Sequence, residues 1–328
     1  MRIAIIGAGW TGSHLATVLM KDHDLVIYDQ EPRPFCGTSQ INQNRLHLGY
    51  HYARNKVTRE MCRTTFAQFM KDYGSLTTEV KQNLYAVPLD ESLLDFGTID
   101  EIFSGDQWHH EQVDAPFLQH TEAVINVQER FISPSKAQTY FEDILAPVFC
   151  QDQLTIEAVE TLQKDYDLVI DCTNNTLLEP LINADYFEAV AMFLYRPKQA
   201  LPFDALTYVD GQLFSLYPYE HGLMSLSHVE HSVIRRSMTP IVTNSESIQT
   251  VGEAMEKTRN HAKHYWPEFD NFLQPVDAVV SMKSKRLSAS ACRTPIFRQE
   301  NNLLSCFTGK IQGIYAIEEK VKAIIASL

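Results

Sequence analysis

The chain has 328 residues, of which 45% are hydrophobic and 21% are charged, and its formal net charge is −13. This length suffices for one large domain or two closely joined domains with an ample core. The negative charge disfavours nucleic acid and anionic membranes as partners, and no apolar run approaches the roughly 20 residues of a membrane span. Because a predicted strand starts at the second residue, we expect no signal peptide and a cytoplasmic location.

The cysteines and histidines do not form a metal-binding pattern. The six cysteines are scattered without a CxxC pair, which indicates reduced thiols rather than a disulfide framework or a zinc site. The twelve histidines include no HExxH or similar spacing. We therefore expect no bound metal.

A dinucleotide-binding fingerprint opens the chain. An apolar run at residues 2–6 leads into the sequence GAGWTG, then into a helical pattern and a second apolar run that ends at Asp29. In such a fingerprint Gly7 permits a tight turn, Gly9 admits a pyrophosphate and Gly12 allows close packing of helix and strand. The helix N-terminus favours phosphate, and Asp29 is placed to bind a ribose. The pattern predicts a bound adenine dinucleotide without deciding which one.

The next unusual segment is TSQINQNRLHLGYHY at residues 38–52. It is dense in amides, aromatic residues and histidines and shows no helical or strand period. A polar surface loop is the simpler interpretation, but so many hydrogen-bonding side chains favour contact with a buried polar ligand.

Further along, the pattern predicts alternating helices and strands. We expect helices at residues 56–73, from the Ser133-Pro134 capping pair onward, at 245–265 and at 314–325. Residues 89–120 are interpreted as irregular, with exposed polar histidines. Strands are expected at residues 82–88, 154–162, 166–173, 189–195, 205–209, 213–217, 222–228 and 275–282.

The strands between residues 186 and 234 are separated by turns, with Asp210-Gly211 as a hairpin signal. They predict an antiparallel sheet inserted into the parallel fold. We expect a discontinuous nucleotide-binding domain made of residues 1–80, 121–182 and 280–328. Residues 81–120 and 183–279 would form a substrate-binding domain.

Together these features resemble the FAD-dependent oxidoreductases of the D-amino-acid oxidase and glycine oxidase superfamily. The resemblance rests on the opening glycines with Asp29, the polar segment 39–52, the sheet residues 213–219, and the late segments 281–296 and 307–310. It departs from the family at Asn174-Asn175, where members usually have a glycine. The late glycine-rich run is also reduced, to Gly309 and Gly313. The resemblance implies an α/β fold: a Rossmann-like, GR2-type FAD-binding domain with an inserted antiparallel-sheet substrate domain.

From this pattern and resemblance we expect FAD as the cofactor. The residues expected to contact it are Gly7, Ala8, Gly9, Trp10, Thr11, Gly12, Asp29, Gln30, Ser39, Asn44, Arg45, Leu46, Thr173, Asn174, Gly309, Lys310 and Ile311. The expected reaction oxidises a CH–NH or CH–OH bond of an amino acid, amine or sugar derivative by hydride transfer to flavin N5.

Two histidines, His47 and His51, are the candidate proton acceptors, since a histidine titrates near neutral pH. Flavin contact and simple packing remain open for both of them. Substrate contacts are expected from Tyr217 and Tyr219, and from arginines able to clamp a carboxylate or phosphate. Among the arginines we rank Arg286 and Arg293 first.

Other functions stay open at this stage. The fingerprint alone would serve an NAD(P)-dependent dehydrogenase equally well, although the late Thr308-Gly309-Lys310 segment argues against it. The Gly-Lys-Ile at 309–311 and the segment around His47 are also similar to UDP-galactopyranose mutases, which use reduced flavin in an isomerisation. A non-catalytic dinucleotide sensor is the most remote alternative. A homo-oligomer is left open.

Overall fold

The computed structural model describes residues 1–178, 186–241, 243, 247–285 and 292–328. The chain forms two compact units, each assembled from separated segments. The first unit comprises Met1–Gln40, Pro134–Tyr186 and Ser284–Leu328, and the second comprises Ile41–Ser133 and Phe187–Lys283.

A six-stranded sheet forms the centre of the first unit, in the order β17-β18-β10-β1-β2-β9. The five strands from β18 to β9 are parallel, and β17 pairs antiparallel at the edge. The strands are apolar along their length, as is typical of a parallel sheet covered on both faces. Their bounds are β1 (Arg2–Ile6), β2 (Asp24–Asp29), β9 (Phe149–Gln151), β10 (Leu168–Asp171), β17 (Ile296–Glu300) and β18 (Leu303–Phe307).

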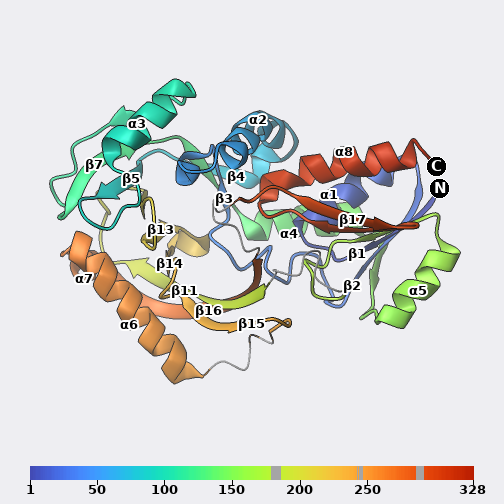
Figure 1. Cartoon of the computed structure of the whole chain (residues 1–328). Helices are drawn as coiled ribbons and strands as arrows, with labels where there is room; N and C mark the ends of the chain where they lie inside the picture. The colour runs from blue at the N-terminus through green and yellow to red at the C-terminus, as the bar shows by residue number, and fades with distance from the viewer. Residues whose placement is uncertain (179–185, 242, 244–246, 286–291) are drawn as a thin grey trace. The chain divides into compact units, whose positions relative to one another are not determined.

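Helices cover both faces of this sheet. On one face, helix α1 (Trp10–Leu19) packs against α4 (Pro134–Leu145) and α8 (Ile314–Ile325). On the other, α5 (Ile156–Asp165) contributes Val159 to a cluster with Ala4 and Ile6 of β1. Figure 1 shows α1 and α8 on one side of the strands and α5 on the opposite side.

The strand expected at residues 154–162 is wrong, because most of this segment is helix α5. The hydroxyl of Thr155 accepts a hydrogen bond from the backbone N–H of Ala158 and so caps the helix. Glu157 in the first turn and Lys164 in the last complement the helix dipole. These capping signals outweigh the local β-branched residues.

A nine-stranded sheet forms the second unit, in the order β15-β11-β14-β13-β12-β5-β7-β6 with β16 beside β11. Most pairs are antiparallel, as expected, but β12 runs parallel to β5. The strands are β5 (Asn83–Pro88), β6 (Glu111–Gln112), β7 (Thr121–Asn126), β11 (Tyr186–Pro197), β12 (Ala205–Tyr208), β13 (Phe214–Pro218), β14 (Met224–His228), β15 (Val233–Ser237) and β16 (Leu273–Lys285).

The second unit also holds helices and a small three-stranded sheet, β3-β8-β4. Helix α3 lies in the segment that we expected to be irregular; Asp95 caps it, and Ile99 and Phe103 are buried. The elements are β3 (Arg45–Leu46), β4 (Thr77–Val80), β8 (Glu129–Ile132), α2 (Lys56–Tyr73), α3 (Phe96–Gly105), α6 (Ile248–Tyr265) and α7 (Phe269–Phe272).

The bounds of the two units differ from the expected domains. Residues 41–80 and 121–133, which we expected in the nucleotide-binding domain, lie in the second unit. The reason is strand pairing: β8 pairs with both β3 and β4, and β7 pairs with β5. Each of these pairs stays within the second unit.

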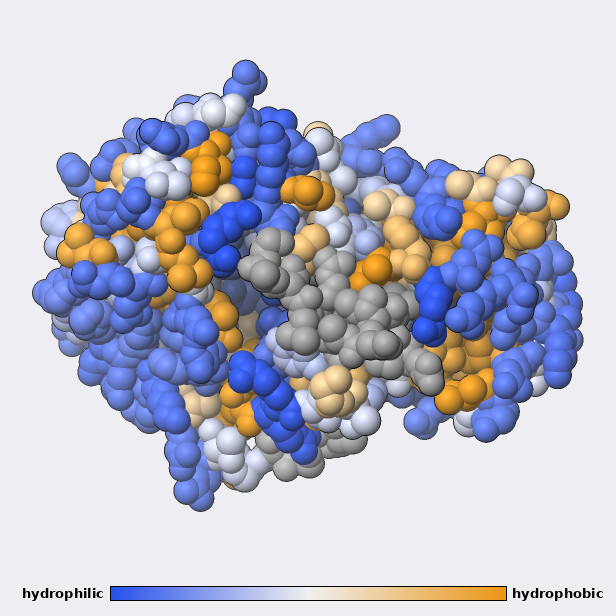
Figure 2. Space-filling model, in the orientation of Figure 1, coloured by the Kyte–Doolittle hydropathy of each residue, from blue (hydrophilic) through white to orange (hydrophobic). Residues whose placement is uncertain are grey.

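Among the described residues no helix combines the length and the apolar character needed to cross a bilayer. On the face shown in Figure 2, hydrophilic residues predominate and apolar residues form small separate groups.

Candidate functional site

The glycine turn of the first unit lies where the order of the parallel strands reverses. From β1, the chain adds β2 and then β9 on one side, and β10 and then β18 on the other. In open α/β sheets, ligands bind beside the carboxyl ends of the strands at such a reversal. Gly7 follows β1 and Thr173 follows β10, so both flank this point. Asp29 ends the neighbouring β2, and Thr308 follows β18 at the same edge.

All three fingerprint glycines are sterically required. A Cβ on Gly12 would lie 1.9 Å from the carbonyl oxygen of Gly7, and a Cβ on Gly9 would lie 2.8 Å from Oγ of Ser39. Gly7 has φ +98°, a conformation that disfavours side chains. The absence of side chains at Gly7 and Gly12 therefore lets the turn, helix α1 and the end of β10 lie close together.

Helix α1 begins after Gly9, which has no side chain to cap it, and its first turn contains no acidic residue. Oγ of Ser39 accepts a hydrogen bond from the Trp10 N–H at 3.1 Å. The Trp10 ring packs edge-on against Phe35 and Phe141. Its indole thus belongs to the core, and the helix N-terminus offers backbone dipoles to a phosphate.

The carboxylate of Asp29 braces the same turn. Oδ2 accepts the Ala8 N–H at 2.6 Å, and Oδ1 accepts the Glu31 N–H at 2.9 Å. The intervening Gln30 is exposed, and its carbonyl oxygen lies 3.5 Å from the side-chain nitrogen of Gln151. A carboxylate has about four acceptor positions, so Asp29 retains capacity for ribose hydroxyls.

On the other side of the reversal, the end of β10 is held by Asp171. This buried carboxylate accepts both the N–H of Thr173 at 2.9 Å and its hydroxyl at 2.7 Å. Burial raises the pKa of Asp171, while these hydrogen bonds and Arg298 act in the opposite direction. Asn174 follows with a positive φ of 60°. Thr173 and Asn174 therefore lie at the edge that carries the glycine turn.

After β18, a second tight turn reaches the same edge. Gly309 has φ +65°, and a Cβ there would lie 2.5 Å from the carbonyl oxygen of Arg293. The Lys310 N–H donates to the carbonyl of Thr308 at 2.7 Å, and Ile311 starts the 3₁₀ turn before α8. Arg293 thus lies beside the turn of Gly309. Arg286 lies outside the described residues.

The polar segment after Gln40 belongs to the second unit, where Arg45 is the centre of a buried cluster. Its Nη1 donates to the Tyr85 hydroxyl at 2.8 Å, and its Nη2 donates to Oγ of Ser215 at 2.6 Å. The guanidinium lies 3.9 Å from the centroid of the Tyr217 ring. Arg45 and Tyr217, expected as cofactor and substrate contacts respectively, are both buried here and contact each other.

Glu129 of β8, which we did not single out from the sequence, completes this cluster. Its carboxylate accepts the Tyr85 hydroxyl at 2.8 Å and the Leu48 N–H at 3.0 Å, and lies 3.4 Å from Nδ1 of His47. Burial would raise the pKa of Glu129, but His47, Arg45 and Tyr85 together lower it. A signal was present in the sequence: Glu129 and Phe131 share the buried face of β8, so a carboxylate occupies a core position.

The remaining expected residues of this segment have backbone roles or lie at the margin of the cluster. Asn44 has φ 48°, and its carbonyl accepts the Ile132 N–H at 2.7 Å. Leu46 is fully buried and pairs with Arg130 of β8. Tyr219 follows β13 and is half-buried, in contrast to Tyr217.

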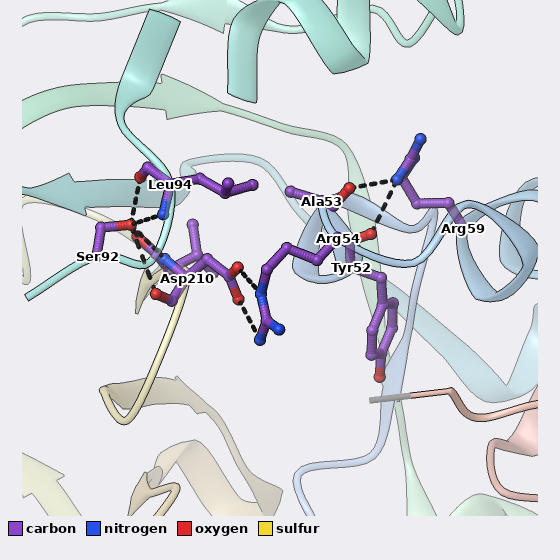
Figure 3. Close-up of polar contacts among 8 residues, drawn as sticks. Tyr52, Ala53, Arg54, Arg59, Ser92, Leu94 and Asp210 are labelled. Carbon is purple, nitrogen blue, oxygen red and sulfur yellow. Dashed lines mark hydrogen bonds and ion pairs between the residues drawn. The ribbon is translucent and has the colours of Figure 1, made fainter. Parts of the chain in front are cut away.

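The segment that carries both histidines is clamped at its far end. Arg54 forms a two-point ion pair with Asp210, and Oγ of Ser92 accepts the Asp210 N–H at 3.0 Å (Figure 3). Nη1 of Arg59 donates to the carbonyls of Tyr52 and Ala53. These contacts hold the 3₁₀ turn Tyr50–Tyr52 in place. His51 lies in this turn, with its ring centroid 5.8 Å from that of His47.

A cluster of three histidines lies elsewhere in the second unit. The rings of His228 and His231 stack at 3.9 Å, and His261 of α6 lies 4.7 Å from His228. Nδ1 of His228 accepts the N–H groups of Glu230 and His231. Burial, followed by the two neighbouring histidines, lowers the pKa of His228 to about 3.

This cluster predicts acid sensitivity. In the unfolded chain His228 takes up a proton near pH 6.5, whereas in the folded chain its pKa is about 3. As the pH falls below 6.5, protonation therefore favours the unfolded chain, and the free energy of unfolding decreases. Replacement of His228 by Asn should reduce the loss of unfolding free energy between pH 7 and 5.5 by about 1 kcal/mol. Urea titrations at both pH values measure this. The exposed His221→Asn serves as control, and an equal effect of both variants would contradict the prediction.

Other surface features lack the groups needed for the expected chemistry. A groove of about 600 Å³ between α6 and β16 is lined by apolar residues such as Val251, Met255 and Val280, and Asp277 is the sole charged residue among its described lining. No cluster of His, Cys, Asp or Glu among the described residues could hold a metal ion. The two sites of interest are thus the glycine turn and the Arg45–Glu129 cluster.

The chain is similar to known proteins over nearly its whole length. No protein-family model matches the chain. Over 98% of its length the chain is 29% identical to the FAD-dependent monooxygenase FPY4 of Fusarium mangiferae, 90% of which is covered.

Several solved structures have the same fold as this chain. Glycine oxidase from Geobacillus kaustophilus superposes with a TM-score of 0.71 at 11% identity, covering 100% of this chain and 94% of that one. A modified fructosyl peptide oxidase from Aspergillus nidulans gives 0.69 at 10% identity, covering 99% and 90%. The chain has the fold of the D-amino-acid oxidase and glycine oxidase superfamily. The expected fold class, with its inserted largely antiparallel sheet, is therefore confirmed.

Within the superfamily fold, the sequence fingerprint and the strand reversal coincide at one place. Both neighbours match this fold over nearly the full chain rather than over one segment.

Proposed function

We propose that this protein is an FAD-dependent oxidoreductase that oxidises a CH–NH or CH–OH bond of a small polar substrate. The observation that carries the proposal is the glycine turn at the strand reversal, with Asp29 bonded to it, in a chain with the superfamily fold. The full-length similarity to an FAD-dependent monooxygenase supports the same cofactor.

The residues at the turn fit an adenine dinucleotide. Gly9 has no Cβ, and the first turn of α1, which contains no acidic residue, suits a pyrophosphate. Asp29 has acceptor capacity for the ribose, and Thr173 and Gly309 lie on the adjoining strand ends. We assign FAD rather than NAD(P), because the late turn of Gly309 and Lys310 returns to this edge.

When bound, FAD supplies the acceptor for the substrate's hydride. The protein's own groups must then bind the substrate, orient it and accept the proton of its hydroxyl or amino group. We propose His47, with His51 beside it, for the proton. For substrate contact we propose Tyr219 and Arg293; Tyr217, also expected in this role, is closed off by Arg45.

A second candidate is monooxygenation, which the name of the FPY4 relative favours. The two chemistries differ in the fate of dioxygen: an oxidase releases hydrogen peroxide, whereas a monooxygenase transfers one oxygen atom to its substrate. Mass spectrometry of the product after turnover in ¹⁸O₂ separates them.

The first test is the absorbance spectrum of the purified protein, before and after heat denaturation. We expect flavin bands that move to the supernatant, and anaerobic bleaching of these bands by amines, amino acids or sugar derivatives. A colourless protein that takes up no added FAD would contradict the proposal and favour NAD(P). Turnover only after chemical pre-reduction, without an acceptor, would indicate an isomerase.

A further inference from the structure

We infer that Cys172 and Cys306 form a redox-sensitive dithiol, which hydrogen peroxide converts to a disulfide at the edge of the six-stranded sheet that carries the glycine turn. The pair stands on the geometry of the first unit alone. The proposed function enters only as one source of the oxidant, since an oxidase releases hydrogen peroxide.

The two cysteines lie on neighbouring parallel strands in the same register. Asp171 of β10 pairs with Ser305 of β18, and each of them is followed by a cysteine. The N–H of Cys172 donates to the carbonyl of Ile6 at 2.8 Å, so the backbone still runs alongside β1 at this residue. Partner residues of parallel strands project from the same face of a sheet. The side chains of Cys172 and Cys306 therefore lie side by side.

The two thiols contact each other. Both cysteines are free, and a hydrogen bond joins their side chains. The Cys306 thiol also donates to the carbonyl of Leu304 at 4.0 Å. Adjacent strands lie about 4.8 Å apart, which falls within the roughly 4.4–6.8 Å that separates the Cα atoms of a disulfide. The cross-link therefore requires rotation of the two side chains rather than a new strand register.

The two thiols differ in their exposure. Cys172 is half-buried, whereas Cys306 is 4% exposed, so a small oxidant reaches Cys172 first and Cys306 resolves the product. The hydrogen bond with Cys306 and burial raise the pKa of the Cys172 thiol. Because the thiolate is the nucleophile, we expect the oxidation rate to rise about tenfold per pH unit between pH 7 and 9.

The oxidation is balanced in atoms and electrons. Sulfur of Cys172 attacks one oxygen of hydrogen peroxide, so that an S–O bond forms, the O–O bond breaks and water leaves. Sulfur of Cys306 then attacks the sulfenic acid, so that an S–S bond forms, the S–O bond breaks and a second water leaves. Two electrons pass from the thiols to the peroxide, and dithiothreitol reverses the change.

The test treats the FAD-bound protein with hydrogen peroxide, alkylates the remaining thiols and digests the chain with trypsin. The tryptic peptides 165–198 and 299–310 each contain one cysteine, Cys172 and Cys306 respectively. We expect a species in which a disulfide joins these two peptides, and its loss after treatment with dithiothreitol. Recovery of the two peptides only as separate alkylated or over-oxidised species would overturn the inference.

A pair of serine variants identifies the thiols that react. Cys150 provides the matched control, because it is half-buried in β9 of the same sheet and lies opposite Tyr28 rather than a cysteine. Wild type and Cys150→Ser should each lose two thiols per chain in a manner that dithiothreitol reverses, whereas Cys172→Ser should lose none. An equal reversible loss in both variants would place the reactive thiols elsewhere and overturn the pair.

Turnover separates this inference from the proposed function. An amine or amino acid that bleaches the flavin should, in air, produce the same cross-link without added peroxide, and catalase should prevent it. Cross-linking by added peroxide alone upholds the pair and overturns the enzyme's own product as the oxidant. A protein whose flavin no substrate reduces would refute the proposed function, while the experiment with added peroxide would still test the pair.

Discussion

A Gly12→Ala variant is expected to lose FAD binding almost completely. The added Cβ would lie 1.9 Å from the carbonyl oxygen of Gly7, so either the glycine turn or α1 must shift. Such a backbone clash costs about 3 kcal/mol or more, which corresponds to a roughly 100-fold or larger rise in the Kd for FAD. Flavin fluorescence titration of the apoprotein measures the effect.

The matched control is Gly252→Ala, since Gly252 is also helical but has open space around its Cβ position. This control should bind FAD normally and gain up to about 1 kcal/mol of stability, because Ala favours the helix. If Gly12→Ala bound FAD as tightly as the control, the glycine turn would not be the cofactor site.

An Arg45→Met variant is expected to be the most destabilised single change in the second unit. It removes the guanidinium that donates to Tyr85 and Ser215 and stacks on Tyr217, and with it one of the positive charges near the buried Glu129. A buried hydrogen bond from a charged group is worth about 1.5–3 kcal/mol. Thermal and urea unfolding of the two proteins measure the loss.

The loss should depend on pH in a defined direction. In the wild-type protein the pKa of Glu129 is lowered, so its contribution is present above the carboxyl's ordinary pKa and is lost in acid. Without Arg45 one of the groups that lower the pKa of Glu129 is lost, so that pKa rises and the ionised carboxylate stabilises the folded state less at neutral pH. The difference from wild type should therefore shrink from pH 7 to pH 5.

The exposed pair of Arg33 and Glu142 provides the comparison for this variant. Arg33→Met removes an arginine whose side chain is 47% exposed, so we expect little change in stability and little pH dependence. Equal losses in both arginine variants would show that the Arg45 cluster does not stabilise the second unit.

Local sequence signals were sufficient to predict the strand, glycine turn and helix that open the chain. The glycine turn, the helix and Asp29 lie within 29 residues, and each glycine is explained by a contact with a nearby turn or strand. The amphipathic helices α2, α4, α6 and α8 were likewise predictable, because their periodicity and caps are encoded in consecutive residues.

The polar cluster of the second unit was not predictable in the same way. Arg45 bonds to residues 40 and 170 positions away, and Glu129 bonds to Tyr85 across 44 positions. These pairings depend on β3, β5, β8 and β13 being brought together by the sheets. Sequence reasoning found the histidine segment by its composition, but it could not find the carboxylate that faces His47.

The strands of the six-stranded sheet that carries the glycine turn come from distant parts of the chain. Its strands β1, β10 and β18 come from residues 2–6, 168–171 and 303–307, so the chain of the second unit is interleaved between them. During synthesis β18 and α8 are made only after the second unit, which ends at Lys283. The early strands cannot pair with β18 before then. Pairings this distant in sequence are slow to form. The six-stranded sheet can therefore be completed only after the whole second unit has been synthesised.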